Sequence, residues 1–529
     1  MIARTTRRGL GLGALAGLLS GAVAIGVGQL VAGITGPGGS PVVEVGQLQI
    51  DLTPPWLKDF AIREFGSHDK TILVGGIIVV LAILAAGFGA LAMRRLAIGF
   101  AGLVVLGTLG LVAVATRPDS RPVDAIPTLA AIAAAAVGLY VLIERARAFT
   151  STSPDPASKP MSATDAPSEQ FSEHELSRRR FLHVSGLAAG TTVAGIAFGD
   201  LFSSRFSVAA DLAKVHLPRP VGKVPRLPAG SDLHIPGLSS FVTPNDAFYR
   251  VDTAILLPEV APDTWTLRIH GMVAREVEIT FDQLLHLPLV EDYITLCCVS
   301  NPVAGPYIGN ALWLGAKLAP LLRRAGVRAG ADQLVCTSAD GFTSGTPIDI
   351  VMDGRDALLA VAMNGSPLPV AHGFPARLVV PGLYGYVSAC KWITDIEVTT
   401  YATNVAYWAD RGWSAQAPIK TESRIDVPSG QTAISAGKTQ VAGVAWAQHK
   451  GIDAVEVRVD RGEWHVARLA AVPGIDCWRQ WVWDWEATPG QHVIEARATD
   501  ARGYTQTALQ APPPPNGASG YPAVNVAVT

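Results

Sequence analysis

At residues 293–302 the chain has the sequence YITLCCVSNP, in which a largely apolar run ends at two adjacent cysteines and a Ser-Asn-Pro turn follows. The pattern predicts a buried strand that enters a loop at Cys297 and Cys298. A thiolate at such a loop is a nucleophile, a soft metal ligand or half of a disulfide. Adjacent cysteines do not readily bridge to each other, because their side chains diverge in an extended chain. Spacing alone leaves a metal ligand and a structural buried cysteine both open.

Several familiar site motifs are absent from the sequence. No Cys-x-x-Cys or His-x-x-x-His pair is present to build a zinc site. There is no Gly-x-Ser-x-Gly elbow for a serine hydrolase and no Gly-x-Gly-x-x-Gly dinucleotide fingerprint. The cysteine loop therefore carries the chemistry that the sequence offers.

Three further segments support a ligand site. Residues 338–343 read SADGFT, a strand end followed by polar groups, and residues 372–377 read HGFPAR, just ahead of a buried apolar run. The glycine-rich stretch 381–392, PGLYGYVSACKW, ends at Lys391. Arg377 and Lys391 are cations of the kind that hold a phosphate, and glycines between them let the backbone approach a ligand closely.

Together and in this order, these segments resemble the sulfite oxidase family of molybdopterin enzymes. The resemblance covers about residues 230–529 and includes the segment MNGSPLP at residues 363–369. It implies an α+β molybdopterin domain followed by an all-β, immunoglobulin-like dimerisation domain. The remaining, N-terminal part of the chain lies outside it.

The resemblance also implies residue roles. Cys298 supplies the one protein thiolate to molybdenum, and Cys297 is a neighbour. The cofactor is molybdenum–molybdopterin, which moves one oxygen atom and two electrons while the protein positions and shields it. The residues that match the family's pterin- and phosphate-binding positions are Tyr249, Arg250, Asp340, His372, Arg377, Ala389, Cys390 and Lys391.

The departures from the family pattern concern the substrate. Sulfite oxidases carry arginines shortly after the ligand cysteine, where this chain has Asn301 and Pro302. The family's active-site tyrosine is matched best by Trp413, and Arg411 remains available to meet an oxyanion. The resemblance therefore implies an aromatic, less anion-selective pocket. Reduction of a small S-oxide or N-oxide and oxidation of a sulfite-like anion stay equally open.

The first two hundred residues read as part of a membrane protein. Of 529 residues, 49% are hydrophobic and 16% charged, and the net charge of −2 argues against nucleic-acid binding. Four uncharged stretches are long enough to span a bilayer: residues 9–34, 71–93, 96–116 and 125–143. None of the four contains histidine, so bis-histidine haem is excluded there, no haem is expected, and electrons need a separate partner. The four lack charged residues, which gives a transporter or channel little support.

A second signal follows these stretches. Residues 150–176, rich in Ser, Pro, Asp and Glu, predict a disordered linker. Residues 177–182, SRRRFL, open a weakly apolar stretch ending near residue 203 and resemble a twin-arginine export signal, which is compatible with a fifth transmembrane helix. We expect the segment to be retained. The arginines flanking the early spans favour a cytoplasmic N-terminus. This predicts a multi-pass cell-membrane protein with its catalytic domain on the extracytoplasmic side.

The expected architecture is multidomain. An all-α transmembrane bundle, an α+β molybdopterin domain and an all-β immunoglobulin-like sandwich follow one another, the last predicted from short alternating strands after residue 419. Within it, Trp481, Trp483 and Trp485 share one strand face, which favours core packing. The resemblance adds a homodimer through this part. The alternative function is a non-catalytic membrane scaffold with a sulfite-oxidase-like binding domain. The expected segments are 1–149, 150–176, 177–203, 204–415 and 416–529.

Overall fold

The computed structural model divides the chain into two units, Met1–Ser207 with Thr253–Leu256, and Val208–Asp252 with Leu257–Thr529. It describes residues 7–54, 57, 60, 69–117, 120–151, 168–203, 207–222, 226–430 and 433–529.

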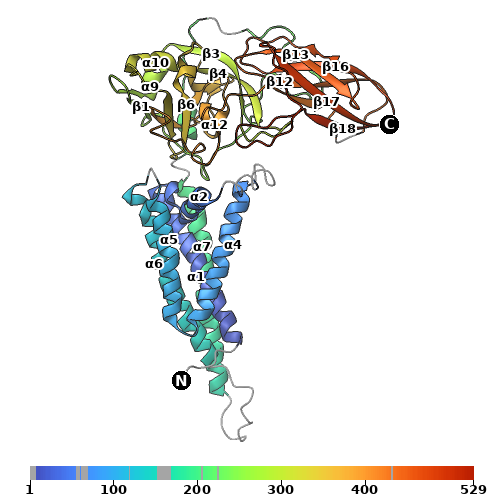
Figure 1. The fold of residues 1–529 in the computed structure, drawn as a ribbon. Coiled ribbons are helices and arrows are strands. Elements are labelled where there is room, and N and C mark those ends of the chain that lie inside the picture. Colours follow the sequence, from blue (N-terminus) through green and yellow to red (C-terminus); the bar gives the residue numbers. More distant parts are fainter. Residues whose placement is uncertain are drawn as a thin grey trace. The chain divides into compact units, whose positions relative to one another are not determined.

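The first unit is helical (Figure 1). Among the described residues, five stretches are long and apolar enough to cross a membrane: Arg7–Thr35, Thr71–Ala92, Leu96–Ala115, Pro122–Ser151 and Glu175–Ser203. The prediction of several apolar spans is confirmed at that level. The elements are α1 (Arg7–Thr35), η1 (Pro37–Gly39), α2 (Pro41–Leu52), α4 (Asp69–Ala92), α5 (Leu96–Ala115), η3 (Pro122–Ala125), α6 (Ile126–Ser151) and α7 (Ser168–Ser203).

Helix α1 packs against α4, α6 and α7 through glycines. A Cβ atom added to Gly17 would lie 2.0 Å from the carbonyl oxygen of Ala85, and one added to Gly33 would lie 2.4 Å from that of Gly199. Such distances leave no room for a side chain, so the backbones meet directly. Small residues permit this approach where apolar packing alone cannot drive association.

The expected linker of residues 150–176 is too long at both ends. Helix α6 continues to Ser151 and α7 begins at Ser168, while residues 152–167 lie outside the described part. Residues 168–176, SEQFSEHEL, include three glutamates, one glutamine and one leucine, residue types that favour a helix. Composition alone had suggested a polar linker, but this propensity extends the following apolar helix toward its N-terminus.

Two sheets form the first part of the second unit (Figure 1). One has the strand order β2-β1-β10-β5-β6, and the other has β3-β4-β7-β8 with β9 paired to β7. The strands are β1 (Thr266–Gly271), β2 (Val277–Thr280), β3 (Leu289–Cys297), β4 (Ile308–Lys317), β5 (Gln333–Ser338), β6 (Thr343–Pro347), β7 (Leu358–Met363), β8 (Ser366–Pro367), β9 (Arg377–Val379) and β10 (Ile393–Thr399).

Short helices connect these strands, which gives the predicted α+β character. They are α8 (Ala209–Leu212), α9 (Phe281–Leu285), α10 (Leu318–Ala325), α11 (Ile348–Met352), η5 (Val370–His372) and α12 (Gly385–Ser388). Helix α9 begins with reciprocal hydrogen bonds at its N-cap. Gln283 N donates to Thr280 Oγ1 (3.3 Å) and Thr280 N donates to Gln283 Oε1 (3.1 Å), which is a capping box.

The C-terminal part consists of two four-stranded antiparallel sheets, ordered β11-β12-β16-β15 and β14-β13-β17-β18. Trp481 and Trp485 are buried in the core between them, with Trp483 partly buried beside them. The all-β character agrees with the sequence, and the immunoglobulin type remains a prediction. The strands are β11 (Glu422–Val427), β12 (Gly437–Trp446), β13 (Ile452–Val459), β14 (His465–Val466), β15 (Arg468–Leu469), β16 (Arg479–Ala487), β17 (Gly490–Asp500) and β18 (Ala523–Val528).

Candidate functional site

The two cysteines lie where strand β3 ends and a loop begins. Both are buried, Cys297 as the last residue of β3 and Cys298 as the first of the loop. Cys298 N donates to the Tyr307 carbonyl (2.9 Å), and Tyr307 N donates to Asn301 Oδ1 (2.8 Å). The first of these bonds joins the two ends of the loop, and the second stabilises the loop through the Asn301 side chain.

The thiol of Cys298 is in its neutral form in this environment. Burial raises its pKa, and hydrogen bonds from the backbone and side chain of Ser300 only partly oppose the shift. A bound cation would reverse this preference, because a coordinated thiol loses its proton. In the described part of the chain, no group of three or more His, Cys, Asp or Glu side chains is placed to hold a metal ion. A metal at Cys298 would therefore take its other ligands from a cofactor.

Tyr249 connects the cysteines to the cationic side of the site. Its ring stacks on Phe248 at 5.2 Å between centroids. Burial raises its pKa well above the usual value, with smaller contributions from Cys298 and Cys297 and an opposing one from Arg377. The hydroxyl therefore stays protonated and is able to donate a hydrogen bond.

Arg377 is a buried cation whose charge is not balanced by a neighbouring carboxylate. Its side chain donates to the carbonyls of His372 (3.0 Å) and Ala389 (3.2 Å) and lies over the Trp313 ring at 5.1 Å. Nε is buried with no hydrogen-bond partner among the described residues, and no carboxylate there lies within ion-pair distance. Burial lowers the pKa of the guanidinium to about 10. Such a group favours an anion, and an arginine fork matches a phosphate well.

Lys391 lies in the same region but is paired. Its Nζ is 2.7 Å from Asp252 Oδ2 and donates to the Ala371 carbonyl (3.2 Å). The same carboxylate oxygen is 2.9 Å from Arg250 Nε, so two cations share one anion. Burial lowers the pKa of Lys391 to about 8, although Asp252 opposes the shift. The pairing leaves net positive charge for a ligand.

Two polar residues complete this group. Burial raises the pKa of Asp340, Asp252 raises it further, and Lys391 opposes the shift. Asp340 Oδ1 accepts a hydrogen bond from Phe342 N (3.2 Å). His372 Nε2 is 2.9 Å from the Asn245 carbonyl. Burial, followed by Arg377, lowers the pKa of His372 to about 4, so the imidazole is neutral at neutral pH. A neutral ring next to Arg377 adds no repulsive charge.

Ala389 and Cys390 contribute chiefly through their backbones. The Ala389 carbonyl accepts from Arg377, and the Cys390 carbonyl accepts from Leu378 N (2.8 Å). The Cys390 thiol is buried, and it donates to the Cys336 carbonyl at 3.6 Å. These contacts hold the turn before Lys391 against strand β9.

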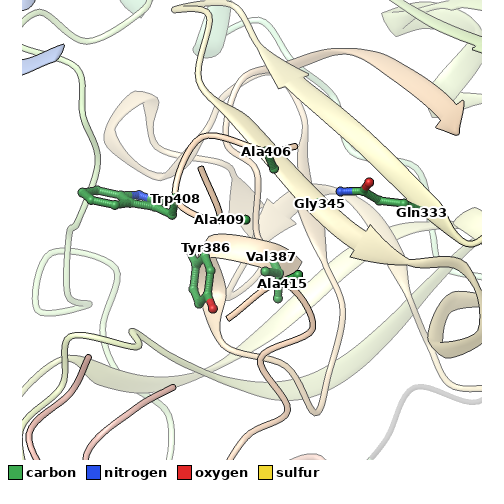
Figure 2. Close-up of a pocket in the computed structure, with 8 residues that line it drawn as sticks. All are labelled: Gln333, Gly345, Tyr386, Val387, Ala406, Trp408, Ala409 and Ala415. Atoms are coloured by element: carbon green, nitrogen blue, oxygen red, sulfur yellow. The ribbon is translucent and has the colours of Figure 1, made fainter. Parts of the chain in front are cut away.

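Arg411 and Trp413 belong to a different group of contacts. Arg411 folds over the Tyr407 ring at 3.7 Å and donates to the Tyr407 carbonyl (2.9 Å). Trp413 is buried against Trp408 and Tyr386, with ring centroids 6.2 and 6.0 Å away. A cavity of about 10 Å³ adjoins them, and Figure 2 shows its lining residues, Gln333, Gly345, Tyr386, Val387, Ala406, Trp408, Ala409 and Ala415.

Sequence reasoning missed several residues that complete the site. Asp252 pairs with Arg250 and Lys391, Trp313 faces Arg377, and Asn245 accepts from His372. The position of Asp252, two residues after Arg250, was the available signal. Trp313 carried none, because its contact with Arg377 arises from a pairing between distant strands.

Part of the chain is similar to known proteins. Residues 254–408 match the family described as oxidoreductase molybdopterin binding domain. The chain is 29% identical over 273 residues to mitochondrial sulfite oxidase of Rattus norvegicus, covering 44% of this chain and 50% of that protein. It is 34% identical over 199 residues to nitrate reductase [NAD(P)H] of Hordeum vulgare, covering 32% of this chain and 22% of that protein. The chain thus spans about half the length of the sulfite oxidases that it matches.

Among solved structures, the sulfane dehydrogenase SoxCD from Paracoccus pantotrophus matches with a TM-score of 0.48 and 23% identity. The match covers 62% of this chain and 97% of that one.

Proposed function

We propose that this chain carries out two-electron oxygen-atom transfer at a molybdenum bound by Cys298. The premise is that residues 254–408 are a molybdopterin-binding oxidoreductase domain of the sulfite oxidase type. The substrate is a small S-oxide or N-oxide or a sulfite-like anion. One observation carries the assignment. The buried Arg377 has a free Nε and no carboxylate partner among the described residues, and both Arg377 and the buried thiol of Cys298 lie close enough to Tyr249 to shift its pKa.

The residues present fit a molybdopterin. When bound, this group supplies an oxygen-transferring metal centre that exchanges two electrons. Arg377 would bind the phosphate with its remaining nitrogen, and Lys391 and Arg250, held by Asp252, would add positive charge around it. Ala389 and Cys390 would keep the turn in place, and Asp340 would accept hydrogen bonds from the pterin's amino groups.

The chain's own side chains then define the environment of the reaction. Tyr249 keeps its proton and offers a hydroxyl donor beside Cys298, because burial raises its pKa. His372 stays neutral, so it does not compete with Arg377 for the anion. The buried walls around Cys297 and Cys298 exclude water, which strengthens each of these polar contacts.

The substrate preference depends on the groups that surround the metal. Asn301 and Pro302 stand where sulfite oxidases carry cations, and Arg411 is stacked on Tyr407. A neutral oxide needs fewer cations than a sulfite-like dianion, so both directions of oxygen transfer remain within the proposal. Trp413 would form an aromatic wall toward the substrate.

The proposal includes a location and partners. Five apolar helices support membrane embedding, with the catalytic unit on the extracytoplasmic side of the cell membrane after export through the twin-arginine segment. Electrons pass to or from a separate protein or small carrier. A homodimer forms through the C-terminal segment, which we take as residues 416–529.

The test compares Cys298→Ser with Cys297→Ser in the full chain, produced in cells that synthesise molybdopterin. We expect about one molybdenum per chain in the wild type and in Cys297→Ser. Cys298→Ser should lose the thiolate-type Mo(V) electron paramagnetic resonance signal and at least 100-fold in turnover of sulfite or of S- and N-oxides. Cys297→Ser is the matched control, because it removes the adjacent buried sulfur.

A wild-type protein free of molybdenum and pterin from competent cells would contradict the enzyme assignment. It would leave a membrane scaffold with a sulfite-oxidase-like domain.

A further inference from the structure

The loop of residues 298–307 begins at Cys298 and is stabilised by hydrogen bonds between residues three positions apart. Asn301 N donates to the Cys298 carbonyl (3.1 Å) and Gly305 N donates to the Pro302 carbonyl (2.9 Å). These bonds fix the shape of the loop. They do not fix the position of the loop relative to the rest of the molecule. The Gly305 carbonyl is not used within the loop and accepts a hydrogen bond from outside it.

Arg424 makes that contact from strand β11 of the C-terminal sheets. Its Nη1 donates to the Gly305 carbonyl (3.0 Å), and its Nη2 donates to Ser239 Oγ (2.8 Å). Its Nε lies 2.6 Å from Asp426 Oδ1, and the other oxygen of Asp426 accepts from Ser239 N (3.0 Å). All three guanidinium nitrogens are used, and the side chain is only 12% exposed. These contacts therefore hold the Arg424 guanidinium in one orientation against the loop.

Loop residues next to strands β12 and β16 of the C-terminal part also hold the end of strand β3, which precedes the cysteines. Trp478 N donates to Thr295 Oγ1 (2.7 Å), Thr295 N donates to the Asp476 carbonyl (2.9 Å), and Gln448 Nε2 donates to the Thr295 carbonyl (2.9 Å). The strand that ends at Cys297 and the loop that begins at Cys298 are thus anchored to the same region. A shift of that region would move both together.

We propose that Arg424 is a positioning residue for the Cys298 loop, so that the C-terminal region forms part of the reaction site through the Arg424–Gly305 contact. The role rests on the proposed function, because it concerns a loop that carries the metal ligand. Arg424 contacts Gly305, Ser239 and Asp426. It acts by holding the loop at one distance from the Tyr249 and Arg377 side of the site.

The first experiment measures hydrogen exchange of the amides in residues 298–307 in the full chain. Arg424→Met removes the donors and keeps much of the apolar stem, and Arg424→Lys restores one donor. The matched control is Arg458→Met. Arg458 lies in the same sheets, pairs with Glu495 at 2.8 Å and lies over Trp464 at 4.5 Å, as Arg424 pairs with Asp426 and lies over Trp478. We expect at least tenfold faster exchange in Arg424→Met, an intermediate rate in Arg424→Lys and no change in the control.

The second experiment measures turnover and the Mo(V) signal in the same variants. Misplacement of a loop by a fraction of an ångström lowers the rate without removing the metal. We expect molybdenum content within twofold of the wild type and a kcat about tenfold lower in Arg424→Met, with a shifted Mo(V) signal and partial rescue in Arg424→Lys. A merely structural role would lower the molybdenum content and leave the signal and kcat of loaded enzyme unchanged.

The outcomes separate this inference from the proposed function. Unchanged exchange in Arg424→Met overturns the inference whatever the activity. Faster exchange with unchanged kcat and Mo(V) signal in loaded enzyme also overturns it. A wild type that holds no molybdenum and turns nothing over contradicts the proposed function, while the exchange measurement still decides whether Arg424 holds the loop.

Discussion

At the scale of single residues, the site is organised by how burial treats charge. Arg377 is buried without a carboxylate, Lys391 is buried with one, and His372 is buried and neutral. Burial of a charge is costly unless a partner compensates for it. Arg377 has no carboxylate among the described residues to compensate its buried charge. It is therefore the residue best suited to bind an anionic ligand.

Arg377→Gln should have opposite effects on the cofactor-free and loaded proteins. The cofactor-free variant should unfold at a higher temperature, because a buried unpaired charge is gone. The loaded variant should retain molybdopterin about 10- to 100-fold less tightly, because a hydrogen bond to a charged group contributes about 1.5–3 kcal/mol. Pterin content after dialysis and thermal denaturation of both forms measure this.

Arg268→Gln is the control for this prediction, because Arg268 is an exposed arginine paired with Glu276 on the same domain. Equal pterin retention in Arg377→Gln and wild type would remove the phosphate assignment.

His372 should make the cofactor-free protein sensitive to mild acid. Its pKa lies near 4 when folded and near 6.5 when unfolded, so the unfolded chain binds the proton first as the pH falls. The contribution is fully present above pH 6.5 and is lost between pH 6.5 and 4, on the order of 3 kcal/mol in total. His372→Gln keeps a donor toward the Asn245 carbonyl and should flatten this part of the profile.

The measurement is the free energy of unfolding against pH for cofactor-free protein. His286→Gln serves as the comparison, because His286 is an exposed side chain at the C-cap of helix α9. A profile of His372→Gln that matches the wild type between pH 4 and 6.5 would contradict the assignment.

At the scale of elements, two kinds of close packing position the parts. In the second unit, strand β3 brings Cys297 to the base of a closed loop, and β9 and the turn after α12 bring Arg377, Ala389 and Lys391 together. In the helical unit, glycines let helix backbones touch. The helix contacts leave no room for an added side chain.

Gly17→Val should therefore disrupt the contact between α1 and α4, whereas Gly11→Val should not. A Cβ on Gly17 would lie 2.0 Å from the Ala85 carbonyl oxygen, but one on Gly11 meets nothing within 4 Å. Overpacking of this kind costs about 1–3 kcal/mol. Thermal aggregation of the detergent-solubilised protein would show a lower midpoint for Gly17→Val alone, and equal midpoints would contradict the helix pairing.

At the scale of the whole molecule, the proposed export signal would decide on which side of the membrane the molybdopterin domain lies. Arg178 and Arg179 are exposed near the beginning of the last apolar helix. Replacing both with lysine preserves the positive charge that orients the helix but removes the arginine pair read by the export machinery. We expect the catalytic unit to become inaccessible to protease added outside intact spheroplasts.

The paired substitution Arg94→Lys and Arg95→Lys, between two earlier spans, should leave accessibility unchanged. Equal accessibility in the Arg178 and Arg179 variant would mean that a positive flank alone suffices for insertion.

The sequence by itself determined the class of enzyme domain, the α+β and all-β succession and the apolar spans. These depend on local order along the chain: the CCVSN turn after an apolar run, alternation in the C-terminal strands and long uncharged stretches. The capped start of α9 was predictable for the same reason, because Thr280 and Gln283 lie three residues apart.

The tertiary structure alone decided which charges are compensated and which region holds the Cys298 loop. Asp252 reaches Lys391 across 139 positions of the chain, and Arg424 reaches Gly305 across 119. No local pattern encodes such contacts, because they arise when distant segments pack and burial makes each unpaired group costly. The same packing places Arg411 over the Tyr407 ring and Trp413 against Trp408 and Tyr386. Tyr407 and Trp408 are close in sequence to these residues, but Tyr386 is not, so the sequence predicts these contacts only in part.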